Sequence, residues 1–138
     1  MKGFLMSGAL DEYNKAMAVL EDLAKDYVVW VQKDLENLEN TYAQACGVSG
    51  NDRDKIIREN LFRIAHDMKG QGATFGYDLI TDIGNHLCRY IERQEKFEKI
   101  EMDVIKIHVD ALRQIIDQKL IAGGGQIGQA LKANVERF

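Results

Sequence analysis

Residues 56–76 read IIRENLFRIAHDMKGQGATFG, and this stretch predicts the helix around which the rest of the chain is organised. At about 100° per residue, an apolar stripe about 60° wide runs along one face of that helix, as is typical of a helix that covers a core. The stripe consists of Ile57, Leu61, Ile64 and Met68. His66 lies about 160–180° from the stripe, so we expect its imidazole to face solvent.

The neighbours of His66 indicate a reactive group with room cleared around it. Phe62 lies one turn before it, and Lys69, Gly70 and Ala73 follow at three, four and seven residues. A nucleophilic imidazole can accept a phosphoryl group, and Lys69 is close enough to contact a phosphate on the ring. A glycine inside a helix costs roughly 1 kcal/mol relative to alanine. Gly70 therefore indicates that a side chain at this position would obstruct a partner.

Other residues on the same face predict a docking surface. Phe62 and Ala73 would supply a modest apolar patch. Lys55 and Arg63 would complement an acidic partner, although Glu59 lies among them. We therefore expect the partner to be a protein.

The composition indicates an all-α protein. The chain has 138 residues, of which 46% are hydrophobic and 29% charged, and it contains no proline. Its net charge of −4 argues against binding to nucleic acid or to anionic membrane, and no apolar run is long enough to span a bilayer. Cys46 and Cys88 are isolated, which excludes a disulfide framework and a structural zinc site. We expect a cytoplasmic protein.

The N-terminal third repeats apolar residues every three or four positions, which predicts an amphipathic helix. The repeating residues are Leu10, Tyr13, Met17, Leu20, Ala24, Tyr27, Val31, Leu35, Leu38, Tyr42 and Ala45. They form either one long helix or two helices with a break near residues 24–27, where Asp26 could cap the second. A coiled-coil dimer is the competing explanation of so long a repeat, but we expect a monomer rather than a dimer.

Three more helices follow. A loop at residues 47–52 precedes a helix that Asp52 can cap and that runs to about Thr74, where Gly76 supplies a left-handed stop. The next helices are expected at 77–96 and 101–122, joined by residues 97–100 and ended by glycines 123–125. This pattern predicts a single domain with an antiparallel four-helix bundle over about residues 27–122. An additional N-terminal helix would cover about 9–26, and a tail at 123–138 would form a short helix or fray.

The motif His66-x-x-Lys69-Gly70 followed by Gly76 resembles the signature of histidine-containing phosphotransfer (HPt) domains, the shuttle modules of two-component phosphorelays. The similarity continues through Tyr77-Asp78-Leu79-Ile80 and in the helical layout of about residues 27–122. The resemblance implies a four-helix bundle in which His66 carries a phosphoryl group on Nε2 and exchanges it with the aspartate of a response-regulator receiver domain. Lys69 would steady the phosphate and Gly70 would admit the receiver.

The resemblance also implies what the chain lacks. A sensor histidine kinase would have to charge the relay, because the chain has no nucleotide-binding motif and no ATP-dependent kinase activity is expected. The receiver would bring its own Mg²⁺, so no cofactor and no metal site are expected here. The chain departs from the family pattern at Cys88, where many members have a glutamine or glutamate that orients the histidine ring. The group that orients His66 is therefore left open.

Several alternatives compete with this interpretation. His66 could be a plain surface histidine, Gly70 a packing glycine, and Phe62 a cover for a neighbouring loop. His86 and His108 are expected to be partly buried structural histidines, because neither belongs to the Glu-x-x-His pairs of a di-metal bundle. The chain could also be a module that binds receivers without carrying phosphate. A fragment of a larger histidine kinase is less favoured, because the chain begins with Met1 and carries no catalytic appendage.

Overall fold

The computed structural model describes residues 2–138, with side chains from residue 8 onward, and all regular elements in this range are helical. The chain divides into two compact units, Met1–Trp30 and Val31–Phe138. The predicted all-α class is confirmed, whereas the single-domain organisation stays a prediction. None of the described helices is long and apolar enough to cross a bilayer.

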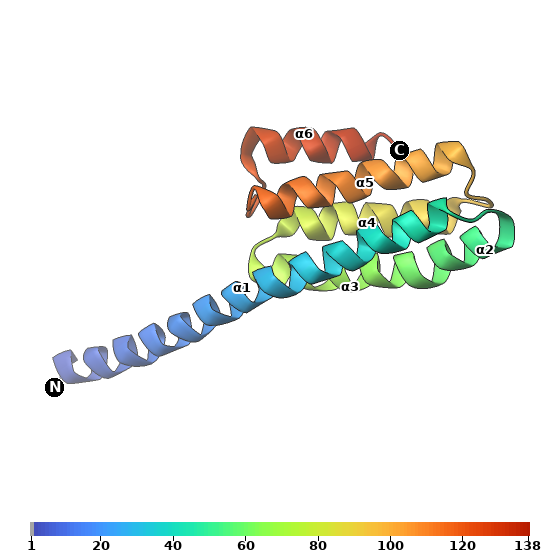
Figure 1. The fold of residues 1–138 in the computed structure, drawn as a ribbon. Helices are drawn as coiled ribbons and strands as arrows, with labels where there is room; N and C mark the ends of the chain where they lie inside the picture. Colours follow the sequence, from blue (N-terminus) through green and yellow to red (C-terminus); the bar gives the residue numbers. More distant parts are fainter. Residues whose placement is uncertain (1) are drawn as a thin grey trace. The chain divides into compact units, whose positions relative to one another are not determined.

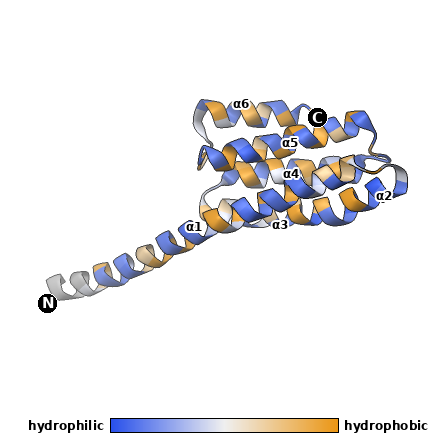
Figure 2. Cartoon of the chain, viewed as in Figure 1, coloured by the Kyte–Doolittle hydropathy of each residue, from blue (hydrophilic) through white to orange (hydrophobic). Residues whose placement is uncertain are grey.

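The first helix, α1 (Lys2–Cys46), passes without interruption through residues 24–27, where the sequence left a break open (Figure 1). Residues 9–26 are therefore the first part of α1 and not a separate N-terminal helix. No glycine or proline occurs between residues 9 and 46. The β-branched cluster near Trp30 lowers helix propensity by only a fraction of a kcal/mol per residue. Figure 2 shows apolar positions recurring in bands along α1.

The second unit contains the bundle. Four helical stretches build it: residues 31–46 of α1, the run from Gly50 to Phe75, α4 (Asp78–Arg93) and α5 (Lys99–Asp117) (Figure 1). Its core includes the fully buried side chains of Leu35, Leu38, Ile57, Leu61, Met68, Ile80, Ile83, Leu87, Ile105 and Leu112. At the surface, the Arg113 guanidinium of α5 pairs with the carboxylate of Glu39 on α1. The bundle predicted from the apolar periodicity is confirmed.

The run that carries the predicted site changes its helical type along its length. It comprises α2 (Gly50–Lys55), a π-helical segment (Ile56–Leu61), α3 (Phe62–Gly72) and a 3₁₀ turn (Ala73–Phe75). Ser49 and not Asp52 occupies the N-cap position. The run ends as predicted at Gly76, whose backbone is left-handed with a φ of 87°.

One residue of the predicted apolar stripe is corrected. Ile57, Leu61 and Met68 are buried, but Ile64 is only half-buried and the neighbouring Ala65 is buried in its place. The π-helical segment winds with i→i+5 bonds, so the spacing of inward-facing residues after it differs from that of a uniform α-helix.

The ends of α4 and α5 also differ from the prediction. Helix α4 stops at Arg93 instead of Lys96, and Phe97 is buried in the connection, where its ring lies 4.8 Å from the Arg58 guanidinium. Helix α5 begins at Lys99 because the Glu101 carboxylate accepts a 3.0 Å hydrogen bond from the backbone N–H of Glu98.

Helix α5 ends at Asp117, five residues before the predicted Ala122. Lys119 and Ala122 both have positive φ, and the backbone N–H of Ala122 donates to the Gly76 carbonyl at 2.7 Å. The chain after Asp117 therefore leaves the helix and crosses to the end of the α3 run.

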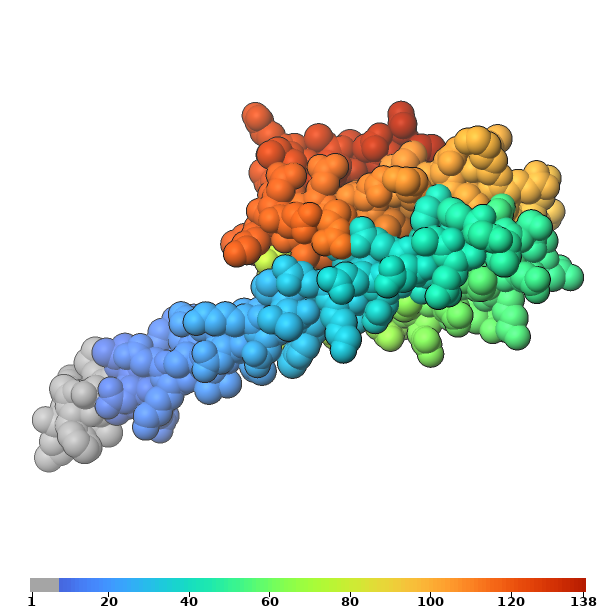
Figure 3. All heavy atoms as spheres, in the orientation of Figure 1, coloured from blue at the N-terminus to red at the C-terminus, as the bar shows by residue number. Residues whose placement is uncertain are grey.

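The predicted tail contains a sixth helix, α6 (Gly125–Glu136), which lies along α5 (Figure 3). Val135 is fully buried, and Lys132 forms an ion pair with Asp82 of α4 at 3.3 Å. The carbonyl of Phe138 accepts a 3.1 Å hydrogen bond from Arg93. These contacts fix the C-terminal segment to the bundle, which corrects the alternative that it frays.

Candidate functional site

His66 projects from α3 into solvent, as its distance from the apolar stripe predicts. Its side chain is 58% exposed, and the Phe62 ring lies one turn before it with a centroid separation of 6.1 Å and an interplanar angle of 27°. The Nδ1 atom lies 4.0 Å from the Asp67 carboxylate. One face of the ring is thus covered by an aromatic neighbour, and its Nδ1 edge faces a negative charge.

The Lys69 side chain is held by the neighbouring helix. Its Nζ donates a 3.1 Å hydrogen bond to Oδ1 of Asn85 on α4. A Cβ at Gly84 would lie 2.9 Å from Cβ of Lys69 and 3.4 Å from the Ala65 carbonyl, so α4 approaches α3 at this point more closely than a side chain allows. Because Gly84 lets the backbones meet, the lysine stem packs on α4 and its ammonium group reaches Asn85.

The two glycines that follow Lys69 differ in their surroundings. A Cβ at Gly70 would meet nothing within 4 Å. A Cβ at Gly72 would lie 2.9 Å from both the Tyr77 carbonyl and the Thr81 hydroxyl oxygen. Gly72 is therefore a packing glycine between α3 and α4, whereas Gly70 leaves open space beside His66.

The hydroxyl group of Thr81 forms hydrogen bonds between the same two helices. It donates to the Lys69 carbonyl and accepts from the Ala73 N–H, both at 2.8 Å. This hydroxyl satisfies two backbone groups at the helix end, where the α-helical bonding pattern is interrupted. Together with Gly84, it fixes the backbone that carries Lys69 and Gly70.

The charges near His66 are mixed. Burial raises the pKa of Asp34 on α1, and the negative charge of Asp67 raises it further, while Lys33 acts in the opposite direction. Asp34 and Asp67 are thus close enough to repel each other. Lys69, three residues after His66 on the same helix, adds a positive charge to this region.

The predicted docking residues are not equally close to His66. Phe62 is half-buried and lines a hollow of about 170 Å³ together with Arg58, Ile91 and Glu92. Ala73 is exposed two turns after His66. Lys55 is exposed on α2, eleven residues and therefore about three turns before His66.

Arg63 is exposed and borders a second hollow of about 400 Å³ between α1 and the helical run. Its lining is largely amide side chains: Asn37, Asn40, Thr41, Gln44, Asn60, Arg63 and Ile64. The surface beside His66 is therefore apolar on the Phe62 side and polar on the Arg63 side.

Cys88, which stands where the family often has a polar residue, is buried. Burial raises the pKa of its thiol to about 11, with Lys69 lowering it and Glu92 raising it. It is thus a neutral core group. Among the described contacts of the His66 side chain, the Phe62 ring and the Asp67 carboxylate are the ones that bear on its orientation.

The other two histidines are paired with each other: His86 is half-buried as expected, whereas His108 is buried more deeply than the expected partial burial. His108 is fully buried, and its Nδ1 donates to the Val104 carbonyl at 2.7 Å, so its Nε2 accepts from His86 Nδ1 at 2.8 Å. Burial lowers the pKa of His108 to about 4, with the Val104 hydrogen bond acting in the opposite direction. His66 is therefore the exposed histidine of the chain.

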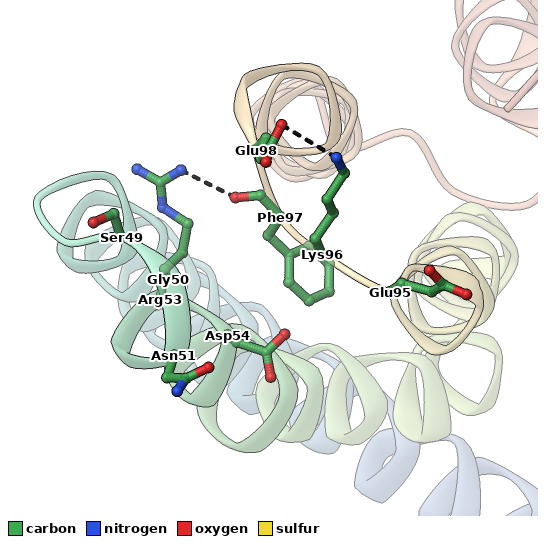
Figure 4. A pocket seen from close by; sticks show the side chains of 9 residues that line it. All are labelled: Ser49, Gly50, Asn51, Arg53, Asp54, Glu95, Lys96, Phe97 and Glu98. Carbon is green, nitrogen blue, oxygen red and sulfur yellow. Dashed lines mark hydrogen bonds and ion pairs between the residues drawn. The ribbon is translucent and has the colours of Figure 1, made fainter.

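A third hollow lies between the start of α2 and the α4–α5 connection (Figure 4). Both of its basic groups are already engaged: Arg53 donates to the Phe97 carbonyl at 3.0 Å, and Lys96 pairs with Glu98 at 3.5 Å. In the described part of the chain, no three histidine, cysteine or acidic side chains are grouped so that they could hold a metal ion. The region around His66 is thus the candidate site.

Gly84, Asn85 and Thr81 were not identified from the sequence. Gly84 itself is the signal that could have revealed this helix contact, because a glycine inside a strongly amphipathic helix often marks a close approach of a second helix. The partners across that contact require the helix register and cannot be read from spacing alone.

Comparison with known proteins agrees with this arrangement. Neither curated proteins nor solved structures gave a significant match to the chain. The family model described as Hpt domain matches residues 22–119, which include α3, α4 and all residues of the candidate site. Hpt domains take part in histidine phosphotransfer in phosphorelays, where they interact with receiver domains and kinases. Because the match covers well over half of the 138 residues, the chain belongs to the Hpt domain family.

Proposed function

We propose that this protein is a phosphorelay intermediate that accepts a phosphoryl group on Nε2 of His66 and passes it to or from the aspartate of a response-regulator receiver domain. The observation that carries the proposal is the exposed imidazole of His66 beside a fixed lysine and an open helical face. The charge of Asp67 beside Nδ1 disfavours a phosphoryl group there, which favours the other ring nitrogen, Nε2.

In the transfer step, the Nε2 lone pair attacks phosphorus and the bond to the receiver's aspartyl oxygen breaks, which regenerates the carboxylate. The reverse step returns the group to a receiver. Catalysis of this kind depends on positioning and on neutralising the charge of the moving group. The ammonium of Lys69 provides that charge, and its hydrogen bond to Asn85 keeps the side chain beside the helix face. The receiver supplies Mg²⁺, and a sensor histidine kinase upstream supplies the phosphoryl group.

The partner surface follows from the surroundings of His66. The hollow beside Phe62 fits an apolar side chain of a receiver, and the open space at Gly70 admits its loops. Arg63 and Ala73 extend this surface, and Lys55 reaches it only with a partner that covers about three helical turns.

The test is transfer of label. The protein is mixed with ³²P-phosphorylated receiver domains and Mg²⁺, and the adduct is tested for acid lability. We expect acid-labile label on the wild type and none on His66→Gln. The matched control is His86→Gln, which removes a histidine on α4 and should remain labelled. Absence of label on the wild type across a panel of receivers would overturn the proposal.

A second candidate function is a receiver-binding module that carries no phosphate. The hollow beside Phe62 would serve such a module equally well. Receiver binding that is unchanged in His66→Gln, together with no transfer to the wild type, would favour this function. The exposed imidazole and the fixed lysine favour phosphotransfer, since binding alone requires neither.

A further inference from the structure

The first unit carries an apolar stripe that is independent of the phosphotransfer site. Leu10, Tyr13, Met17 and Leu20 follow each other at alternating steps of three and four residues, and Ala24 continues the repeat. The stripe is open to solvent: Tyr13 is 61% and Leu20 57% exposed. Tyr27 and Val31 continue the spacing but are buried, so the exposed stripe covers residues 10–20 and ends at the half-buried Ala24.

The repeat has the geometry of a coiled-coil seam. With Leu10 at position a, the seam positions a and d are all apolar from residue 10 to residue 24. The flanking positions of the seam in this range are Asn14, Ala16, Glu21 and Leu23. Only one of these four is charged, so no row of like charges opposes association with a second helix.

The side-chain sizes favour an antiparallel partner of the same sequence. If two copies cross with Met17 of one opposite Leu20 of the other, Tyr13 of each copy faces Ala24 of the second copy. In the same register the flanking Ala16 faces Leu23, so a large side chain meets a small one on both sides of the central Met17–Leu20 contact. A parallel pair would instead stack tyrosine on tyrosine and leave a void between two alanines.

The charges outside the seam do not distinguish the two orientations. In the antiparallel register, Asp11 of one copy comes to the same side as Lys25 of the second, but Glu12 comes to the same side as Asp26, so one pair attracts and the other repels. The helix is already formed through this stretch, which lowers the ordering cost of association.

We therefore propose that residues 10–24 of α1 form an antiparallel two-helix interface with a second copy of this chain. The proposal differs from the monomer expected from the sequence, and it does not depend on the phosphotransfer function. The seam is about 21 Å long, or about two heptads, so the dimer is expected to be reversible.

The first experiment is sedimentation equilibrium of the full chain over roughly a hundredfold range of concentration. We expect a monomer–dimer equilibrium that Met17→Glu/Leu20→Glu shifts toward monomer by at least about tenfold, because four carboxylates would meet at the centre of the seam. Val29→Glu is the matched control, since Val29 is an exposed apolar residue on the opposite side of the same helix and should leave the equilibrium unchanged. A monomer at all concentrations would overturn the proposal.

The second experiment fixes the orientation without disturbing the seam. Chains with one introduced cysteine, Ala16→Cys or Leu23→Cys, are prepared with Cys46→Ser, which removes the exposed native thiol and leaves only the buried Cys88 beside the introduced one. When the two chains are mixed and mildly oxidised, the antiparallel register predicts mixed disulfides between the two variants. A dimer that gives no mixed disulfide between the two variants would contradict the antiparallel register, and a double-Glu variant that still dimerises would place the interface elsewhere.

Discussion

Gly70 lies close to His66 in the helix, and nothing lies near the position that a Cβ would occupy. A substitution at Gly70 can therefore affect phosphotransfer without affecting the stability of the fold. Gly70→Gln should leave the free energy of unfolding unchanged or raise it by up to about 1 kcal/mol, because a helical glycine is replaced. Its side chain would occupy the space proposed for the receiver. We therefore expect slower phosphotransfer from a receiver, measured by label transfer, alongside an undiminished urea-unfolding midpoint. Transfer at the wild-type rate would show that Gly70 provides no clearance.

Lys69 and Asn85 form one unit in the proposed mechanism, because the lysine contacts the phosphate and the asparagine positions the lysine. A hydrogen bond from a charged group contributes about 1.5–3 kcal/mol. Lys69→Ala should therefore slow transfer by roughly ten- to a hundredfold, and Asn85→Ala should slow it less. In the double variant the two effects should not add, because Asn85 has no lysine left to position. Additive losses in single-turnover transfer would show that the two residues act separately.

At the level of elements, the contact between α3 and α4 depends on glycines that have little space around them. Gly84→Ala places a Cβ 2.9 Å from Cβ of Lys69, and relief of that clash requires the helices to separate. Overpacking of this kind costs about 1–3 kcal/mol, which chemical denaturation would detect. The same variant should also transfer more slowly, because Lys69 moves with the contact. Gly70→Ala, the same substitution at an open position, is the control and should not destabilise the bundle.

The sequence predicts where most of the helices lie, but it does not predict the contacts between them. The exposed position of His66, the left-handed turn at Gly76 and the bundle helices all follow from apolar periodicity and glycine chemistry. The burial of Ala65 in place of its neighbour Ile64 could not be predicted from the sequence. The predicted apolar stripe assumes a uniform α-helix, whereas the run contains a π-helical segment. The hydrogen bond of Lys69 to Asn85 depends on how two helices are rotated about their axes, which periodicity defines only to within a face.

At the level of the whole molecule, the buried histidine pair makes stability depend on pH. The pKa of His108 is about 4 in the folded protein and near 6.5 when unfolded, so the unfolded state binds more protons between these values. Stability is therefore fully present above pH 6.5 and is lost as the pH falls toward 4. Burial also lowers the pKa of His86, which adds to the loss in the same direction.

Between pH 7 and pH 5 we expect His108 to contribute a decrease of about 2 kcal/mol in the free energy of unfolding. Urea denaturation at the two pH values measures this difference. His108→Gln should reduce the pH dependence, even though it also lowers stability at pH 7 by breaking the pair with His86. A pH dependence in His108→Gln equal to that of the wild type would assign the effect to other groups.

The π-helical segment Ile56–Leu61 has a consequence for how the site tolerates changes in chain length. A π turn inside a helix holds one residue more than the α-helix that would fill the same space. Removal of one exposed residue there, such as Asn60, would restore ordinary winding and leave the helix on both sides with its original faces. Between Leu61 and His66 the chain winds as an ordinary α-helix and contains no extra residue that a deletion could remove. A deletion of one residue there would turn His66 by about 100° away from its present direction. Insertions and deletions in this helix should therefore concentrate in the turn that precedes the site.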